Sequence, residues 1–131
     1  MADAHALAHE LIERARDDER AAKALLSASE VSDEIVGFHA QQAVEKSLKA
    51  ALAAVGAEFP FTHNLVVLMQ LCADAKLQLP DSLSDADLLT PYAAQLRYGA
   101  TPPATVRREQ ALELARDATQ WASAVVDAPA R

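Results

Sequence analysis

Apolar residues in this chain return every three or four positions, and that period limits what the chain can fold into. The first recurring set consists of Leu7, Leu11, Ala15, Ala22 and Leu25. Arg, Asp and Glu fill most positions between them. A helix turns once in about 3.6 residues, so this spacing places the apolar side chains on one face. We therefore predict a long amphipathic helix from about residue 3 to about residue 29.

Capping and stopping residues place the next two helices. Ser32 or Asp33 is expected to cap a second helix, and Gly56 lies where its C-terminal stop belongs. A proline-containing linker follows, after which Thr62 or His63 opens a third helix. These two helices are predicted to span about residues 33–55 and 62–75.

Two further breaker segments predict a fourth and a fifth helix. Ser84 is a suitable N-cap for a helix over about residues 85–98, which Pro91 is expected to kink. Gly99–Pro103 is the strongest breaker in the chain, and Thr101 or Thr105 is expected to cap the last helix, which runs to about residue 126. The prediction is an all-α, single-domain bundle of about five helices over residues 1–131, with an up-down antiparallel core.

Composition narrows the classes of function. The net charge of -7 argues against a protein that coats nucleic acid, which would need concentrated Lys and Arg. Cys72 is the only cysteine, which fits a reducing cytoplasm and leaves no disulfide or cysteine-based zinc site. No apolar run is long enough to span a bilayer. His5 and His9 have a spacing that can hold zinc, but we predict no metal and no cofactor, because the pattern is more often a solvated face.

The second predicted helix carries two opposed stripes. At about 100° per residue, one stripe is apolar and the other polar. The apolar stripe contains Val44, Leu48, Leu52 and Val55, and the polar stripe contains His39, Gln42, Lys46 and Lys49. One interpretation is a core face and a solvated face, with an ion pair between Glu45 and Lys49. The other is that the His, Gln and Lys donors contact phosphates and base edges.

This helix also carries a family resemblance, in the run Phe38-His-Ala-Gln-Gln-Ala-Val-Glu-Lys-Ser-Leu-Lys-Ala-Ala-Leu52. The run resembles the second helix of HEPN domains, which typically contains an aromatic residue, Ala-Gln-Gln-Ala, Glu-Lys and Lys-Ala at these positions. Phe61-Thr-His-Asn-Leu65 is similar to the family's Thr-His-Asp-Leu, which opens helix three. Leu89-Thr-Pro-Tyr92 and Arg97-Tyr98 are similar to its Tyr, then Arg-Tyr, in helix four.

The resemblance implies a helical homodimer, often encoded beside a minimal nucleotidyltransferase with which it forms a toxin and antitoxin pair. It also implies a candidate site for nucleotide or RNA, made of the family's polar signature. These residues are Gln42, Lys46, Lys49, His63, Arg97 and Tyr98. We expect Arg97 to grip phosphate and Tyr98 to stack on a base. The alternative is that the same residues only hold the helices or a dimer together.

The resemblance further implies an activity, because many HEPN members are metal-independent ribonucleases that use an Arg and a His with four to six residues between them. Here Pro102, Pro103 and Ala104 occupy the positions at which that His would follow Arg97. The motif is absent, so a binding and regulatory module is the favoured function. A ribonuclease using His63 with Arg97 is the first alternative, and a purely structural dimerisation domain is the second.

Overall fold

The computed structural model describes residues 2–93 and 106–129, and its regular structure is helical. Its α-helices are α1 (Ala2–Leu25), α2 (Asp33–Ala54), α3 (Leu65–Asp74) and α5 (Arg108–Val126). Two short 3₁₀ helices, η1 (Asp81–Leu83) and η2 (Ala86–Leu89), follow α3, and residues 90–93 are again α-helical. No strand occurs among the described residues. The all-α prediction is confirmed.

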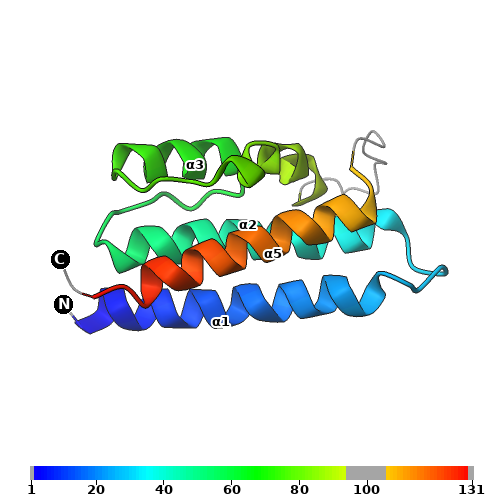
Figure 1. Cartoon of the computed structure of the whole chain (residues 1–131), viewed down its shortest axis with the longest axis horizontal. Helices are drawn as coiled ribbons and strands as arrows, with labels where there is room; N and C mark the ends of the chain where they lie inside the picture. Colours follow the sequence, from blue (N-terminus) through cyan, green and yellow to red (C-terminus); the bar gives the residue numbers. More distant parts are fainter. Residues whose placement is uncertain (1, 94–105, 130–131) are drawn as a thin grey trace.

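Helix α2 lies at the centre of the bundle. In Figure 1, α1 packs antiparallel to α2, while α3 and α5 run in the same direction as α2 and cover two of its other sides. Segment 55–64 makes this possible by running back along α2 before α3 begins. The core is built from the apolar residues of α2, among them Val44, Leu48 and Leu52, together with Leu65 and Leu68 of α3 and Leu114 of α5.

Two helices end in the same backbone motif. After α2, Gly56 has a φ of 74°, its N–H donates to Ala53 O, and Ala57 N donates to Leu52 O. This is the hydrogen-bond pattern of a Schellman motif, in which a residue with positive φ ends the helix. Gly56 is therefore the predicted stop. Lys76, with a φ of 63°, does the same after α3.

The predicted start of the third helix was wrong by two or three residues. Asn64 is the N-cap of α3, and its side-chain oxygen accepts hydrogen bonds from Val66 N and Val67 N. Thr62 instead accepts a hydrogen bond from Asn64 N. Thr62 and Asn64 can both cap a helix, and Asn64 does so because its side-chain oxygen meets the first turn of α3.

The predicted starts of the last two helices were also wrong. Ser84 follows η1 and caps no α-helix, and Pro91 causes no kink because it lies in the first turn of the helical segment 90–93. Proline is tolerated there because the first turn uses no N–H donor. The N-cap of α5 is Arg107, so neither Thr101 nor Thr105, which lie outside the described residues, caps it. The first helix ends at Leu25 rather than near residue 29.

Arg108 fastens the end of α1 to the start of α5. Its Nη1 donates to the carbonyl oxygens of Leu25, Leu26 and Ala28, at 3.1, 3.2 and 3.2 Å. Its Nη2 donates to Val31 O at 2.7 Å, and its Nε lies 2.6 Å from Asp33 Oδ1. The guanidinium thus satisfies carbonyls that the end of a helix leaves without intrahelical partners.

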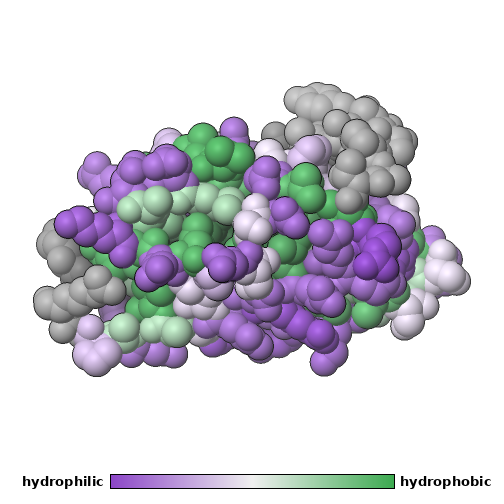
Figure 2. Space-filling view, turned by 45° about the horizontal axis from the view of Figure 1, so that its top comes forward, coloured by the Kyte–Doolittle hydropathy of each residue, from purple (hydrophilic) through white to green (hydrophobic). Residues whose placement is uncertain are grey.

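Trp121 packs against the core, and its Nε1 donates to Gln78 O at 3.0 Å. Among the described residues, no helix has both the length and the apolar character needed to cross a membrane. Figure 2 shows a face on which hydrophobic side chains gather over the side that carries α3, while the opposite edge is mainly hydrophilic. Val66 and Val67 of α3 and Leu88 of η2 are among the exposed apolar residues.

Candidate functional site

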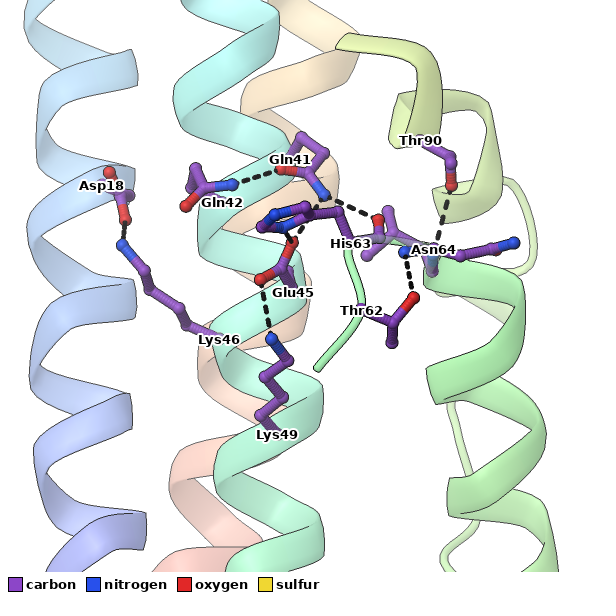
Figure 3. A network of polar contacts seen from close by, with 11 residues as sticks. Asp18, Gln41, Gln42, Glu45, Lys46, Lys49, Thr62, His63, Asn64 and Thr90 are labelled. Carbon is purple, nitrogen blue, oxygen red and sulfur yellow. Dashed lines mark hydrogen bonds and ion pairs between the residues drawn. The ribbon is translucent and has the colours of Figure 1, made fainter. Parts of the chain in front are cut away.

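Polar side chains gather along the middle of α2, between α1 and the loop that precedes α3. Figure 3 shows Gln41, Gln42, Glu45, Lys46 and Lys49 projecting from α2 at this place. They form two groups of contacts. The Glu45 cluster consists of Gln41, Glu45, Lys49 and His63, and the Asp18 cluster consists of Asp18, His39 and Lys46.

Glu45 is the centre of the first cluster and is almost fully buried, at 4% exposure. Gln41 Nε2 and His63 Nδ1 donate to its Oε1 at 3.0 and 2.9 Å. Lys49 Nζ donates to its Oε2 at 2.9 Å. The predicted Glu45–Lys49 pair is therefore present, but it is buried and not solvated, and both carboxylate oxygens have partners.

The environment of Glu45 favours its charged form. Burial alone would raise the pKa of this carboxyl group. Hydrogen bonds from Gln41, Lys49 and His63, together with the charge of Lys49, outweigh the burial, and the pKa falls below its ordinary value of 4.5. Glu45 is therefore an ionised acceptor at neutral pH.

The same cluster holds the loop before α3 against α2. Gln41 Nε2 also donates to the backbone oxygen of His63 at 3.2 Å, and Gln41 Oε1 accepts from Gln42 Nε2 at 2.7 Å. On the far side of the loop, Leu65 N donates to Thr90 Oγ1 at 3.3 Å. The His63 backbone is thus tied to α2 while the next turn is tied to the segment that begins at Thr90 (Figure 3).

The Asp18 cluster joins α1 to α2. Lys46 Nζ lies 2.6 Å from Asp18 Oδ2, and His39 Nδ1 lies 3.1 Å from Asp18 Oδ1. These side chains are more open than those around Glu45, with exposures of 25% for Lys46 and 29% for His39. When the imidazoles are neutral, the carboxylates of Asp18 and Glu45 balance the ammonium groups of Lys46 and Lys49. The polar side chains of these two clusters, called the polar strip of α2 below, therefore offer directed hydrogen-bond donors rather than net positive charge.

Aromatic rings border the Glu45 cluster. Phe59 is partly buried against the core, whereas Phe61 is 93% exposed. The centroid of the Phe61 ring lies 5.7 Å from that of His63, with the planes at 68°. Lys49 Nζ lies 5.7 Å from the Phe61 centroid and 6.0 Å from the Phe59 centroid.

The structure brings together four of the predicted site residues, Gln42, Lys46, Lys49 and His63. Arg97 and Tyr98 lie outside the described residues. The expectation that Lys49 belongs to a solvated stripe was wrong, because α3 and the loop before it cover that side of α2 and leave its side chain 11% exposed. Lys46 and Gln42 are the α2 donors of this set that are partly open to solvent.

Asp18, Gln41 and Phe61 belong to the site in the structure but were not predicted as site residues from the sequence. Gln41, Glu45 and Lys49 are spaced four residues apart, which was a signal that they could form one connected row on a helix. Asp18 and Phe61 carried no comparable signal. Their proximity to α2 depends on how α1 and the loop pack.

Two surface hollows of the described residues lie away from this site. One of about 420 Å³ lies between α1 and α5 and is lined by Arg16, Glu19, Arg20, Thr119, Gln120 and Ser123. Another, of about 370 Å³, lies where the start of α1 meets the ends of α2 and α5. His5 Nε2 and His9 Nε2 are 3.1 Å apart, and the described part of the chain holds no group of three or more His, Cys, Asp or Glu side chains that could bind a metal ion.

Comparison with known protein families identifies the fold. A family model described as the HEPN domain matches residues 8–127, nearly the whole chain. The chain belongs to the HEPN domain family. The family predicted from the resemblance is thereby confirmed. Neither curated proteins nor solved structures gave a match.

Within this HEPN domain, the segments that carry the family resemblance meet in space. Gly37 of α2 packs against Tyr92, where an added Cβ would lie 2.4 Å from the ring. His63 contacts Glu45, and Leu65 contacts Thr90. The HEPN signature therefore includes contacts that join α2, the loop before α3 and the segment after η2.

Proposed function

We propose that this HEPN domain is a binding and regulatory module that holds a nucleotide or single-stranded RNA on the polar strip of α2. The carrying observation is the row of partly open donors, Gln42 and Lys46, beside a loop that displays His63 and Phe61. Amide and ammonium groups can donate to phosphates and base edges. The ligand would contact these outer groups while the buried Glu45 cluster keeps the loop in place.

The balanced charge of the strip gives this proposal a specific signature. Proteins that bind RNA mainly by neutralising phosphates lose affinity steeply as salt rises. Here Asp18 and Glu45 already neutralise Lys46 and Lys49. Binding should therefore depend weakly on salt and rest on hydrogen bonds and stacking.

Calorimetry and fluorescence anisotropy with ATP, GTP and short single-stranded RNAs test the proposal. Lys46→Ala and Gln42→Ala should each weaken binding by about 1 kcal/mol, the contribution of a typical hydrogen bond. Lys23→Ala is the matched control, since Lys23 is exposed in the last turn of α1 and removes the same charge away from the strip. Arg97→Ala and Tyr98→Ala test the two residues that the sequence predicts to bind phosphate and to stack on a base. Absence of binding to nucleotides and to RNA alike would refute the proposal.

One observation favours a second function, cleavage of RNA. A buried carboxylate against Nδ1 of an imidazole fixes the orientation of the ring, as in many acid and base catalysts. In such a ribonuclease, His63 Nε2 would take the proton of the 2′-hydroxyl, whose oxygen attacks phosphorus. The bond from phosphorus to the 5′-oxygen would break and that oxygen would take a proton from water, which leaves a 2′,3′-cyclic phosphate and a 5′-hydroxyl. The substitution of Pro and Ala for the family's His after Arg97 makes this the alternative.

Incubation of end-labelled RNA with the purified protein separates the two functions. The ribonuclease hypothesis requires cleavage that ends in a 2′,3′-cyclic phosphate and is lost in His63→Ala. His39→Ala is the control, because it removes an imidazole that also faces a carboxylate but lies between α1 and α2. Cleavage that survives both His63→Ala and Arg97→Ala would show that neither residue is catalytic.

The proposal also includes two partners, a second copy of the chain and a minimal nucleotidyltransferase, as expected for a toxin and antitoxin pair. Membership of the HEPN family supports both proposed partners. Light scattering on a sizing column measures the oligomeric state. Co-expression with a nucleotidyltransferase encoded beside the gene, followed by co-purification, tests the second partner. If neither a dimer nor a complex forms, the chain acts as a monomeric binding module.

A further inference from the structure

Phe61 is displayed to solvent in a way that its neighbour Phe59 is not. The two rings are separated only by Pro60, yet Phe59 packs against the core while Phe61 is 93% exposed. Of the large apolar side chains that are described, Phe61 has the greatest exposure. Burial of Phe59 anchors this part of the loop, and Pro60 fixes one backbone angle between the two rings.

The backbone that follows Phe61 is held in place from several sides. Gln41 and Glu45 bind the backbone and the ring of His63, and Asn64 caps α3. The Phe61 ring itself meets the His63 ring edge to face. An aromatic side chain on such a braced loop loses little further freedom when a ligand arrives.

The surroundings of Phe61 are polar, which distinguishes it from an apolar docking face. Thr62, His63 and Asn64 follow it, and Lys49 Nζ lies 5.7 Å from its ring centroid. A flat ring bordered by imidazole, ammonium and amide groups matches a nucleotide, whose base offers a π-face and polar edges and whose sugar carries a phosphate.

We propose that Phe61 is a stacking platform for an unpaired nucleobase, with His63 and Lys49 at the border of the stacked base. This inference rests on the proposed function and specifies its ligand class as single-stranded RNA or a nucleotide with an accessible base. Recognition by stacking tolerates different bases, because every base has a π-face.

The test compares two probes, a fluorescent single-stranded oligoadenylate and an oligomer of the same length made of abasic ribose phosphates. Phe61→Ala and Phe61→Leu should each bind oligoadenylate about tenfold more weakly than the native protein, since a stacked base contributes roughly that much. Phe61→Tyr, which keeps the ring, should bind like the native protein. The abasic oligomer should bind the native protein and Phe61→Ala equally.

Controls separate stacking from other causes. Ile35→Ala shortens another exposed apolar side chain, at the start of α2, and should leave binding unchanged. Thermal unfolding of each variant shows that the fold is retained, as expected for a side chain with so little burial.

Three outcomes overturn the inference. Full binding by Phe61→Leu would mean that the site needs an apolar group but no ring, as a protein partner would. Unchanged binding of oligoadenylate by Phe61→Ala would remove the platform and leave the proposed function intact. No binding of oligoadenylate or nucleotides by the native protein would remove both.

Discussion

The Glu45 and Asp18 clusters are built from the same three chemical groups, yet the molecule uses them differently. Each has a carboxylate that faces a His Nδ1 and a Lys Nζ. The Glu45 side chain is 5% exposed and also accepts from Gln41, whereas the Asp18 side chain is 14% exposed. The first cluster fixes a loop onto the core, and the second joins two helices near the surface. Burial rather than composition sets the role of each.

The largest effect is expected from removal of the buried carboxylate. Glu45→Ala should lower the free energy of unfolding by about 3 kcal/mol, because it leaves the buried ammonium of Lys49 without its partner. Chemical denaturation measures this change. A double variant that adds Lys49→Met should recover much of the loss, since it removes the unpaired charge. If Glu45→Ala lowers the free energy of unfolding no more than Asp18→Ala does, the two clusters do not differ in their contribution to stability.

Acid should weaken the Glu45 cluster in the native protein. The pKa of Glu45 in the folded chain is below its ordinary value of 4.5, so its contribution to stability is complete above that value. The contribution is lost as the pH falls through the lowered pKa of the folded state. The stability advantage of the native protein over Glu45→Gln should therefore narrow on going from neutral pH to below about pH 4.

Denaturation of both proteins across this range measures the difference. Glu30→Gln controls for the loss of one exposed carboxylate in the segment after α1. If the stability advantage over Glu45→Gln instead grows as the pH falls, the pKa of Glu45 is raised and not lowered in the folded protein.

The Asp18 cluster should tolerate disruption better. Asp18→Ala should cost about 1 kcal/mol of unfolding free energy, near the upper end for surface ion pairs, because the pair with Lys46 is partly buried. The expected defect is looser packing of α1 on α2, with the loop at His63 unchanged. Hydrogen exchange of the α1 amides and of the loop amides, compared in Asp18→Ala and Glu45→Ala, tests this separation. Faster exchange in the loop of Asp18→Ala would contradict it.

Salt should produce the smallest effect and should act on one cluster only. Screening weakens interactions between exposed charges more than interactions between buried ones. Lys46→Met should therefore cost a few tenths of a kcal/mol less at about 1 M salt than at low salt, while the cost of Lys49→Met should change little. Unfolding of both variants at the two salt concentrations measures the difference, and equal sensitivity would argue for equal burial.

The sequence predicted the helical class, the family and the ion pair between Glu45 and Lys49 because each depends on local spacing. It could not predict that Lys49 is buried. A helical projection treats the side opposite the apolar stripe as solvent, but α2 is central and has α1, α3 and α5 around it. Asp18 and Phe61 were missed for the same reason, since their contacts with α2 residues come from tertiary packing.

The helix starts show a second limit. Thr62 and Asn64 can both cap a helix, and N-cap preference ranks Asn above Thr, but the prediction placed the start at Thr62 or His63. In the structure, Asn64 caps α3, and hydrogen bonds from Gln41 to His63 O and from Leu65 N to Thr90 hold the residues on either side of it. The sequence therefore identified the region in which the helix begins but not the capping residue.

The Arg108 contacts have a consequence for the order in which the chain acquires its structure. The guanidinium joins carbonyls at the end of α1 and in the connection to α2 to the first turn of the last helix, across separations of 77 to 83 residues. Contacts between such distant positions must bear the cost of closing a long loop. During synthesis, α1 and α2 are complete long before Arg108 is made. The side-chain hydrogen bonds that Arg108 gives to the connection between them can therefore form only after the C-terminal helix has begun to be made.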